Sequence, residues 1–146
     1  MAHLICFRTA RFDVTQETPN ESNPIAGESV LGWLREELGK ANYRSTKPNY
    51  EDWGWYIDVN GADAAYMVGA SAEVEYKDDE DSASSYDVKS NAPLDWTVRI
   101  HKQRTLKEKL LGKNKMAAED VLCTLIERIV RSADEIENVS VRRDAS

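Results

Sequence analysis

The sequence has few cysteines and no long hydrophobic run, and each of these scarcities excludes a class of protein. Its two cysteines, Cys6 and Cys123, are too few for a disulfide-rich secreted scaffold or a four-cysteine zinc site. The longest apolar runs span only a few residues, whereas a transmembrane helix needs roughly 20. Residues 1–8 also lack the apolar core of a signal peptide. We therefore expect a cytoplasmic protein with no membrane partner and with both thiols buried.

Recognised catalytic motifs are scarce as well. The sequence contains no GxSxG, Walker A, HExxH or CxxC motif, and no GxGxxG after a strand. His3 and His101 are the only histidines. A general base needs a partner that orients it. His101 could take Glu73 or Glu75 across the sheet, but an exposed histidine on a solvated sheet face is the favoured interpretation. The acidic stretch 78–81 lacks the spaced ligands and the glycine turn of a calcium loop. We therefore predict no catalytic residue, no metal and no cofactor.

The composition that remains is typical of a globular domain. The 146 residues are 41% hydrophobic and 31% charged, which suits one domain over 1–146 with a core of its own. The net charge is −7, which does not favour general binding to nucleic acid or anionic membranes. Residues 73–87 hold seven acids and one lysine, and residues 99–115 hold seven basic residues and one glutamate. These two segments are the charged surfaces that a partner would meet.

Apolar periodicity divides the chain into strands and helices, because an apolar stripe marks a helix and alternation marks a strand. In chain order we expect a strand over 3–14, a helix over 23–39, strands over 53–59, 62–76 and 94–102, a helix over 116–133 and a short strand over 139–141. The sequence therefore predicts one α+β domain of order β-α-β-β-β-α-β, with a largely antiparallel sheet and two main helices packed mainly on one face. Residues 77–93 are expected to be an acidic mobile loop, and residues 143–146 a polar tail.

The start of the first helix has two candidate positions. Asn23-Pro24 is a typical start, since asparagine caps exposed N–H groups and proline at the first helical position loses no needed donor. Gly27 and Gly32 weaken the helix, which makes a start nearer Glu28 the alternative. The residues expected to form the apolar stripe of this helix are Val30, Leu31, Leu34 and Leu38.

The central hairpin follows from one strong turn signal. Asn60-Gly61 predicts a two-residue turn, because both central positions of that turn favour positive φ. That register would place Asp58 opposite Asp63, where two carboxylates repel unless they point into water. Alternation along 53–59 places Trp53 on the inward face together with Trp55.

The function that this profile favours is a non-enzymatic, acidic protein-binding module of the inhibitor, neutralising or accessory type, which docks to a protein partner. An acidic face can mask a basic site on that partner. Tyr50 and Trp53 are candidate aromatic anchors, since both residue types are enriched at interfaces. The acids expected to form the partner-binding face are Glu73, Glu75, Asp78, Asp79, Glu80, Asp81 and Asp87.

Two alternatives stay open. A small enzyme or small-ligand-binding protein would need a deep pocket that combines Tyr56, Asp58, Arg99 and His101. Phosphate or nucleic-acid binding would instead use the basic segment 99–115, whose lysines precede a predicted helix N-terminus, a natural position for an anion. The residues expected to carry that anion-binding alternative are Arg99, Lys102, Arg104, Lys113 and Lys115.

Overall fold

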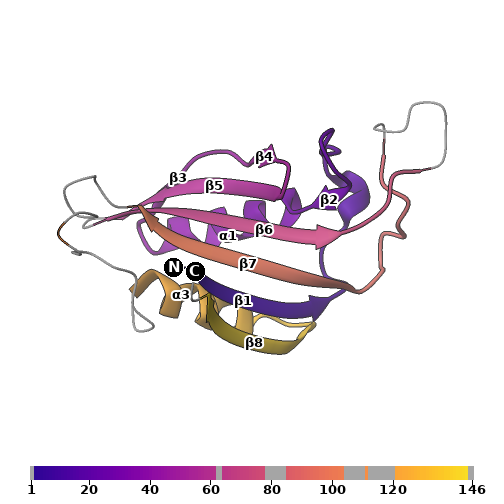
Figure 1. Cartoon of the computed structure of the whole chain (residues 1–146). Coiled ribbons are helices and arrows are strands. Elements are labelled where there is room, and N and C mark those ends of the chain that lie inside the picture. The colour runs from indigo at the N-terminus through magenta and orange to yellow at the C-terminus, as the bar shows by residue number, and fades with distance from the viewer. Residues whose placement is uncertain (1, 62–63, 78–84, 104–110, 112–120, 145–146) are drawn as a thin grey trace.

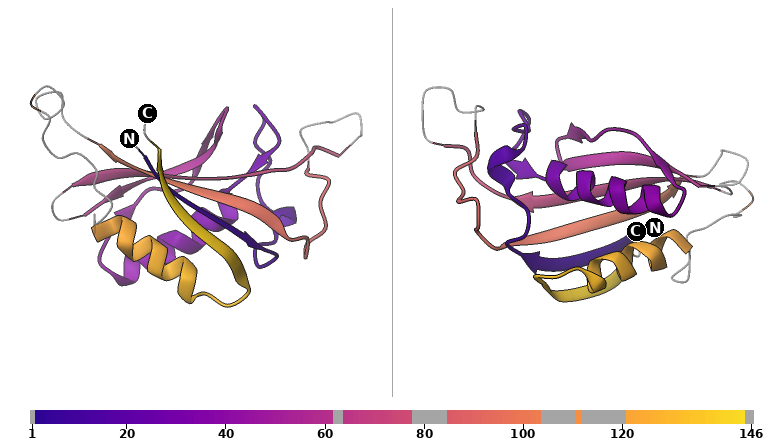
Figure 2. Two further views of the ribbon diagram at one scale, coloured as in Figure 1. Left: turned by 60° about the horizontal axis from the view of Figure 1, so that its bottom comes forward. Right: turned by 180° about the vertical axis from the view of Figure 1, so that it is seen from behind.

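The protein is a two-layer α+β domain, as the sequence predicts. The computed structural model describes residues 2–61, 64–77, 85–103, 111 and 121–144. In this part of the chain, eight strands form one antiparallel sheet. Helices α1 (Glu28–Lys40) and α3 (Val121–Ser132) both lie on one face of the sheet, as Figures 1 and 2 show. The opposite face is called the open face below.

The first and last long strands lie side by side in the sheet, an order that the sequence left undetermined. The main path runs β3-β5-β6-β7-β1-β8, while β2 pairs with β6 and β4 pairs with β5. The strands are β1 (Ala2–Thr9), β2 (Ile25–Ala26), β3 (Arg44–Ser45), β4 (Asn49–Glu51), β5 (Gly54–Asn60), β6 (Ala65–Glu73), β7 (Leu94–Gln103) and β8 (Ile136–Asp144). The predicted element order is therefore confirmed, with β2, β3 and β4 as short additions.

The core forms between the sheet and the two helices. Alternation along the strands turns side chains such as Ile57, Val98 and Ile5 toward the helices, where all three are fully buried. The predicted stripe of α1 and the apolar face of α3 cover them. The fully buried helical residues are Val30, Leu31, Leu34, Leu38, Leu122, Cys123, Ile126 and Val130. Among the described residues, no helix is long and apolar enough to cross a membrane.

Helix α1 begins at Glu28, so the prediction of a start at Asn23-Pro24 was wrong and the alternative start is confirmed. Its N-cap residue, Gly27, has no side chain to accept the exposed N–H groups of the first turn. The carboxylate of Glu17 accepts them instead, from the backbone nitrogens of Gly27, Glu28 and Ser29 at 2.9, 3.0 and 3.0 Å. A residue ten positions upstream thus caps the helix, because the intervening loop folds back onto it.

The β5–β6 connection is longer than the predicted two-residue turn. Asn60 pairs with Ala65, Val59 lies opposite Tyr66, and Gly61 N–H donates to the Ala64 carbonyl at 2.9 Å. Asp58 therefore lies opposite Met67, and the predicted Asp58–Asp63 opposition was wrong. The register differs from the predicted one by four residues, an even shift that keeps the side chains of β6 on their expected faces. It places the bulkier Tyr66, rather than an alanine, opposite Val59 in the core layer.

Candidate functional site

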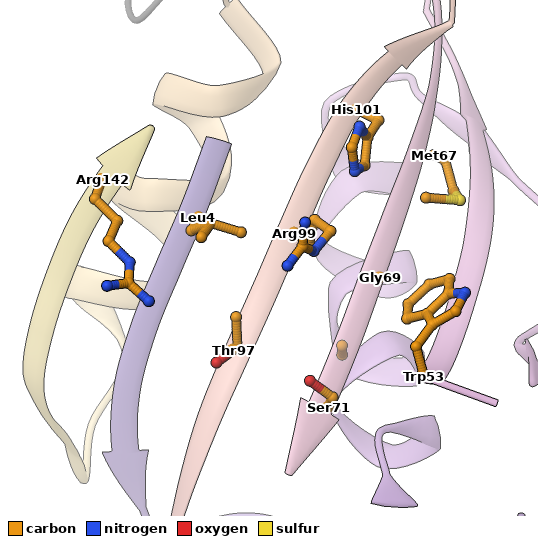
Figure 3. Close-up of a pocket in the computed structure, with 10 residues that line it drawn as sticks. Leu4, Trp53, Met67, Gly69, Ser71, Thr97, Arg99, His101 and Arg142 are labelled. Atoms are coloured by element: carbon orange, nitrogen blue, oxygen red, sulfur yellow. The ribbon is translucent and has the colours of Figure 1, made fainter. Parts of the chain in front are cut away.

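A groove of about 550 Å³ lies on the open face of the sheet. Strands β1, β6, β7 and β8 and the residue before β5 form its walls, as Figure 3 shows. Its charged or basic side chains are Arg99, His101 and Arg142, and its largest apolar side chains are Trp53, Met67 and Leu4. None of its described lining residues is acidic. The groove is thus positively charged in a chain whose net charge is −7.

Strand register aligns the key residues in one row across the sheet. Gly69 on β6 lies opposite Arg99 on β7, Arg99 lies opposite Leu4 on β1, and Leu4 lies opposite Arg142 on β8. Adjacent strands are about 4.8 Å apart, so the α-carbons of the two arginines are separated by roughly 10 Å. Leu4 is only 6% exposed although it is not part of the main core. The row therefore places one arginine on each side of a single apolar side chain.

Trp53 forms the end of the groove that lies over β6. It directly precedes β5, and Gly54 has a φ of 147°, which interrupts the alternation that the sequence pattern implies. Trp53 is consequently 42% exposed on the open face, whereas Trp55 is buried at 2%, so the prediction that Trp53 faces inward was wrong. Its ring lies over Gly69 and 6.2 Å from the ring of Tyr56, measured between centroids.

A second hollow of about 440 Å³ adjoins the groove. Ser71 and Thr97 line both, so the two depressions are continuous along the open face. The second hollow contains an ion pair between Arg8 Nη1 and Asp95 Oδ1 at 3.1 Å, and it also contains Glu73. The charge on the open face therefore changes along the strands, from positive in the groove to mixed in the second hollow.

The predicted acidic face is only partly within the described residues. Glu73, Glu75 and Asp87 are described and exposed, whereas Asp78, Asp79, Glu80 and Asp81 lie outside the described residues. The mobility expected for residues 77–93 therefore stays a prediction. Asp87 N–H donates to the Glu75 carbonyl at 2.7 Å, which holds these two acids side by side.

Two tyrosines hold the base of this acidic segment against the domain. Tyr76 and Tyr86 form an isolated antiparallel bridge, and their rings stack with centroids 6.2 Å apart. The buried Tyr86 hydroxyl accepts a hydrogen bond from Asn20 N–H at 2.7 Å and donates one to the Ile25 carbonyl at 3.1 Å. Burial raises the pKa of Tyr86 to about 12. The described part of the segment is thus tied to the loop that precedes α1.

The two predicted aromatic anchors occupy different environments. Tyr50 is half-buried and packs edge-on against Trp55, with ring centroids 5.2 Å apart, so it belongs to the border of the core. Trp53 lines the groove with Arg99, whereas Glu73 lines the second hollow. The structure therefore brings Trp53 together with cations rather than with Glu73, Glu75 and Asp87, the described members of the predicted acidic face.

The predicted anion-binding set is also divided. Arg99 lies on the open face, but Lys102 is three positions further along β7, and alternation turns it toward the helices. Arg104, Lys113 and Lys115 lie outside the described residues. The basic residue that joins Arg99 in the groove is Arg142, which was not among the residues predicted from the sequence. Alternation around Val141 indicated an outward side chain there, but only the β1–β8 pairing reveals its neighbours.

The residues considered for an enzyme or a small-ligand pocket are only partly brought together. Arg99 and His101 line the groove, while Tyr56 contacts Trp53 and Asp58 accepts a hydrogen bond from Gln103 Nε2 at 3.2 Å. His101 lies opposite Met67, so neither Glu73 nor Glu75, the partners considered for it, is its cross-strand neighbour. Within the described part of the chain, no three His, Cys, Asp or Glu side chains form a group that could hold a metal ion.

The cysteines differ in burial. Cys123 is fully buried in α3, as expected. Cys6 is half-buried on the open face, with its Sγ 3.8 Å from Thr97 Oγ1, so the expectation that it is buried was wrong. Neither cysteine is among the residues that line the groove.

Comparisons with protein-family models, with curated proteins and with solved structures find no match for this chain.

Proposed function

We propose that this chain is a protein-binding module that docks an acidic segment of a partner protein on the open face of its sheet. The observation that carries the proposal is the row in which Arg99 and Arg142 flank Leu4 at one side of the exposed Trp53. A local positive charge on an otherwise negative protein selects a negatively charged partner and repels a positively charged one.

The residue types of the groove support a protein partner. Tryptophan, arginine and methionine are enriched in protein interfaces, and tryptophan and arginine dominate binding energy where they are buried by the partner. Trp53, Arg99, Arg142 and Met67 are of these types. The groove also continues into the second hollow through Ser71 and Thr97, which gives a longer surface than a compact small molecule covers. Docking alone is sufficient for an inhibitor, neutralising or accessory protein.

The acidic face is a second candidate docking surface, for a basic partner. The hydrogen bond from Asp87 N–H to the Glu75 carbonyl favours it, because this bond keeps two exposed carboxylates together. The neighbouring Tyr86 fixes this part of the chain through its own hydrogen bond to the Ile25 carbonyl. It would bind the opposite charge from the groove, so one experiment separates the two surfaces.

Peptide binding tests this function. A fluorescently labelled glutamate-rich peptide and a lysine-rich peptide of equal length are titrated with the protein, and fluorescence anisotropy is measured. We expect the glutamate-rich peptide to bind, and the variants Arg99→Glu and Arg142→Glu to weaken it about tenfold or more. Arg128→Glu is the matched control, since Arg128 is an exposed residue of α3, on the helical side, and its substitution changes the net charge equally.

Each outcome separates one explanation from another. Equal losses in all three variants would show a general charge effect and would overturn the groove as the site. Binding of the lysine-rich peptide that Glu75→Lys abolishes would favour the acidic face instead. A DNA oligonucleotide that binds more tightly than the peptide, and is lost on Arg142→Glu, would replace the protein partner with a nucleic acid.

A further inference from the structure

The groove contains a position for a ring as well as positions for negative charges. The Trp53 indole lies against the backbone of β6, with Gly69 beneath it and the Tyr56 ring beside it at 6.2 Å. Although it is seated in this way, 42% of Trp53 remains exposed. An exposed indole held against a strand offers a firm apolar surface on which a second ring or apolar group can pack.

The distance between this surface and the cations is set by the sheet. Gly69, Arg99, Leu4 and Arg142 occupy four consecutive strands in one row. Arg99 therefore lies one strand spacing, about 4.8 Å, from the residue beneath Trp53, and Arg142 lies roughly 14 Å from it. Figure 3 shows the same sequence of side chains, with Trp53 at one end, Arg99 between and Arg142 at the other end.

We propose that the docked acidic segment carries an aromatic side chain, which packs on Trp53 while acidic groups next to it pair with Arg99 and Arg142. This inference rests on the proposed function and identifies the kind of partner segment. A purely acidic segment would pair with the arginines but would leave the Trp53 ring in water. An aromatic residue beside the acids covers Trp53 and Met67, and it excludes water from the neighbouring guanidinium groups, which strengthens their pairing with carboxylates.

Two peptides of equal charge and length test the inference. One is glutamate-rich with a single central tyrosine, and the other has alanine at that position. We expect the wild-type protein to bind the tyrosine peptide several-fold more tightly, as ring–ring contacts provide in well-packed sites. The Trp53→Ala variant should bind both peptides with the affinity that wild type shows for the alanine peptide. Arg142→Glu should weaken both peptides by a similar factor.

The control variant is Trp33→Phe. Trp33 lies on α1, on the other side of the sheet, where its ring packs 5.3 Å from that of Phe12. This variant should keep the wild-type preference for the tyrosine peptide, and circular dichroism checks that every variant is folded.

The outcomes distinguish this inference from the proposed function. Equal wild-type affinity for the two peptides would overturn the aromatic anchor and leave the acidic docking segment intact. A Trp53→Ala variant that still prefers the tyrosine peptide would overturn Trp53 as the packing surface. Absence of binding to both peptides would overturn the proposed function together with the inference.

Discussion

The indole ring of Trp53 occupies the space that a side chain at Gly69 would fill. A β-carbon at Gly69 would lie 2.7 Å from Cζ3 and 2.9 Å from Cη2 of Trp53, closer than atoms in van der Waals contact. Gly69→Ala should therefore displace the ring, which lies at the far end of a rotatable side chain, while the strand is retained. We expect a shifted tryptophan emission maximum, a loss of the preference for the tyrosine peptide and a change in unfolding free energy within about 1 kcal/mol. An unchanged peptide preference would contradict this account.

Gly32→Ala should stabilise the protein. Gly32 lies in the interior of α1, and a β-carbon there would meet no atom within 4 Å. Alanine restricts the unfolded chain and favours the helix, which is worth about 0.5–1 kcal/mol. Urea unfolding measures the gain. The variant also serves as the glycine-to-alanine control for Gly69→Ala, because it should bind both peptides as the wild type does; destabilisation would show a steric conflict at this position.

Glu17 should make stability depend on pH. Burial raises the pKa of Glu17 above the ordinary value of 4.5, although hydrogen bonds from Ser29, Gly27 and Glu28 oppose the shift. The folded state therefore holds this proton more tightly than the unfolded state does. The resulting stabilisation is complete below pH 4.5 and is lost as the pH rises through the folded-state pKa.

The variant Glu17→Gln removes this titration and isolates its effect. Urea unfolding of both proteins is measured from below pH 4.5 to neutral pH. The free energy of unfolding of the wild type, relative to that of the variant, should fall as the pH rises. A difference that stays constant across this range would show that the two states of the protein hold the Glu17 proton equally.

The two thiols should react at different rates. Cys6 is half-buried on the open face, whereas Cys123 is fully buried in α3. A thiol reagent should therefore modify one cysteine per chain under native conditions and both after unfolding. Mass spectrometry locates the label, and Cys6→Ser should abolish the native reaction. Rapid native labelling of Cys123 would indicate that α3 opens readily from the sheet.

Most of the core could be predicted from the sequence because its signals are local. Val30, Leu31, Leu34 and Leu38 lie close together in the sequence, and their spacing alone indicates one face of a helix. All four residues are buried as expected. The alternation along 94–102 similarly identified β7 and its inward side chains. These patterns depend only on which residues share a face.

The candidate site could not be predicted because it is assembled across strands that are distant in sequence. Arg142 joins Arg99 through Leu4, which lies almost at the other end of the chain. Alternation along 53–59 gave the wrong face for Trp53, because the positive φ of Gly54 changes the direction of the backbone at the start of β5. Glu17 is missed as a cap for a similar reason, since capping signals are sought next to the helix and not ten residues away.

Strand alternation also separates the residues that hold the domain together from those that face a ligand. Arg99 has Val98 and Ile100 as its chain neighbours, and both of these are fully buried on the opposite face. Outward positions of the row can therefore be varied without altering the packed layer beneath them. The chain thus provides a scaffold for combinatorial libraries, in which randomising positions 53, 99 and 142 would yield binders of different specificity built on one shared interior.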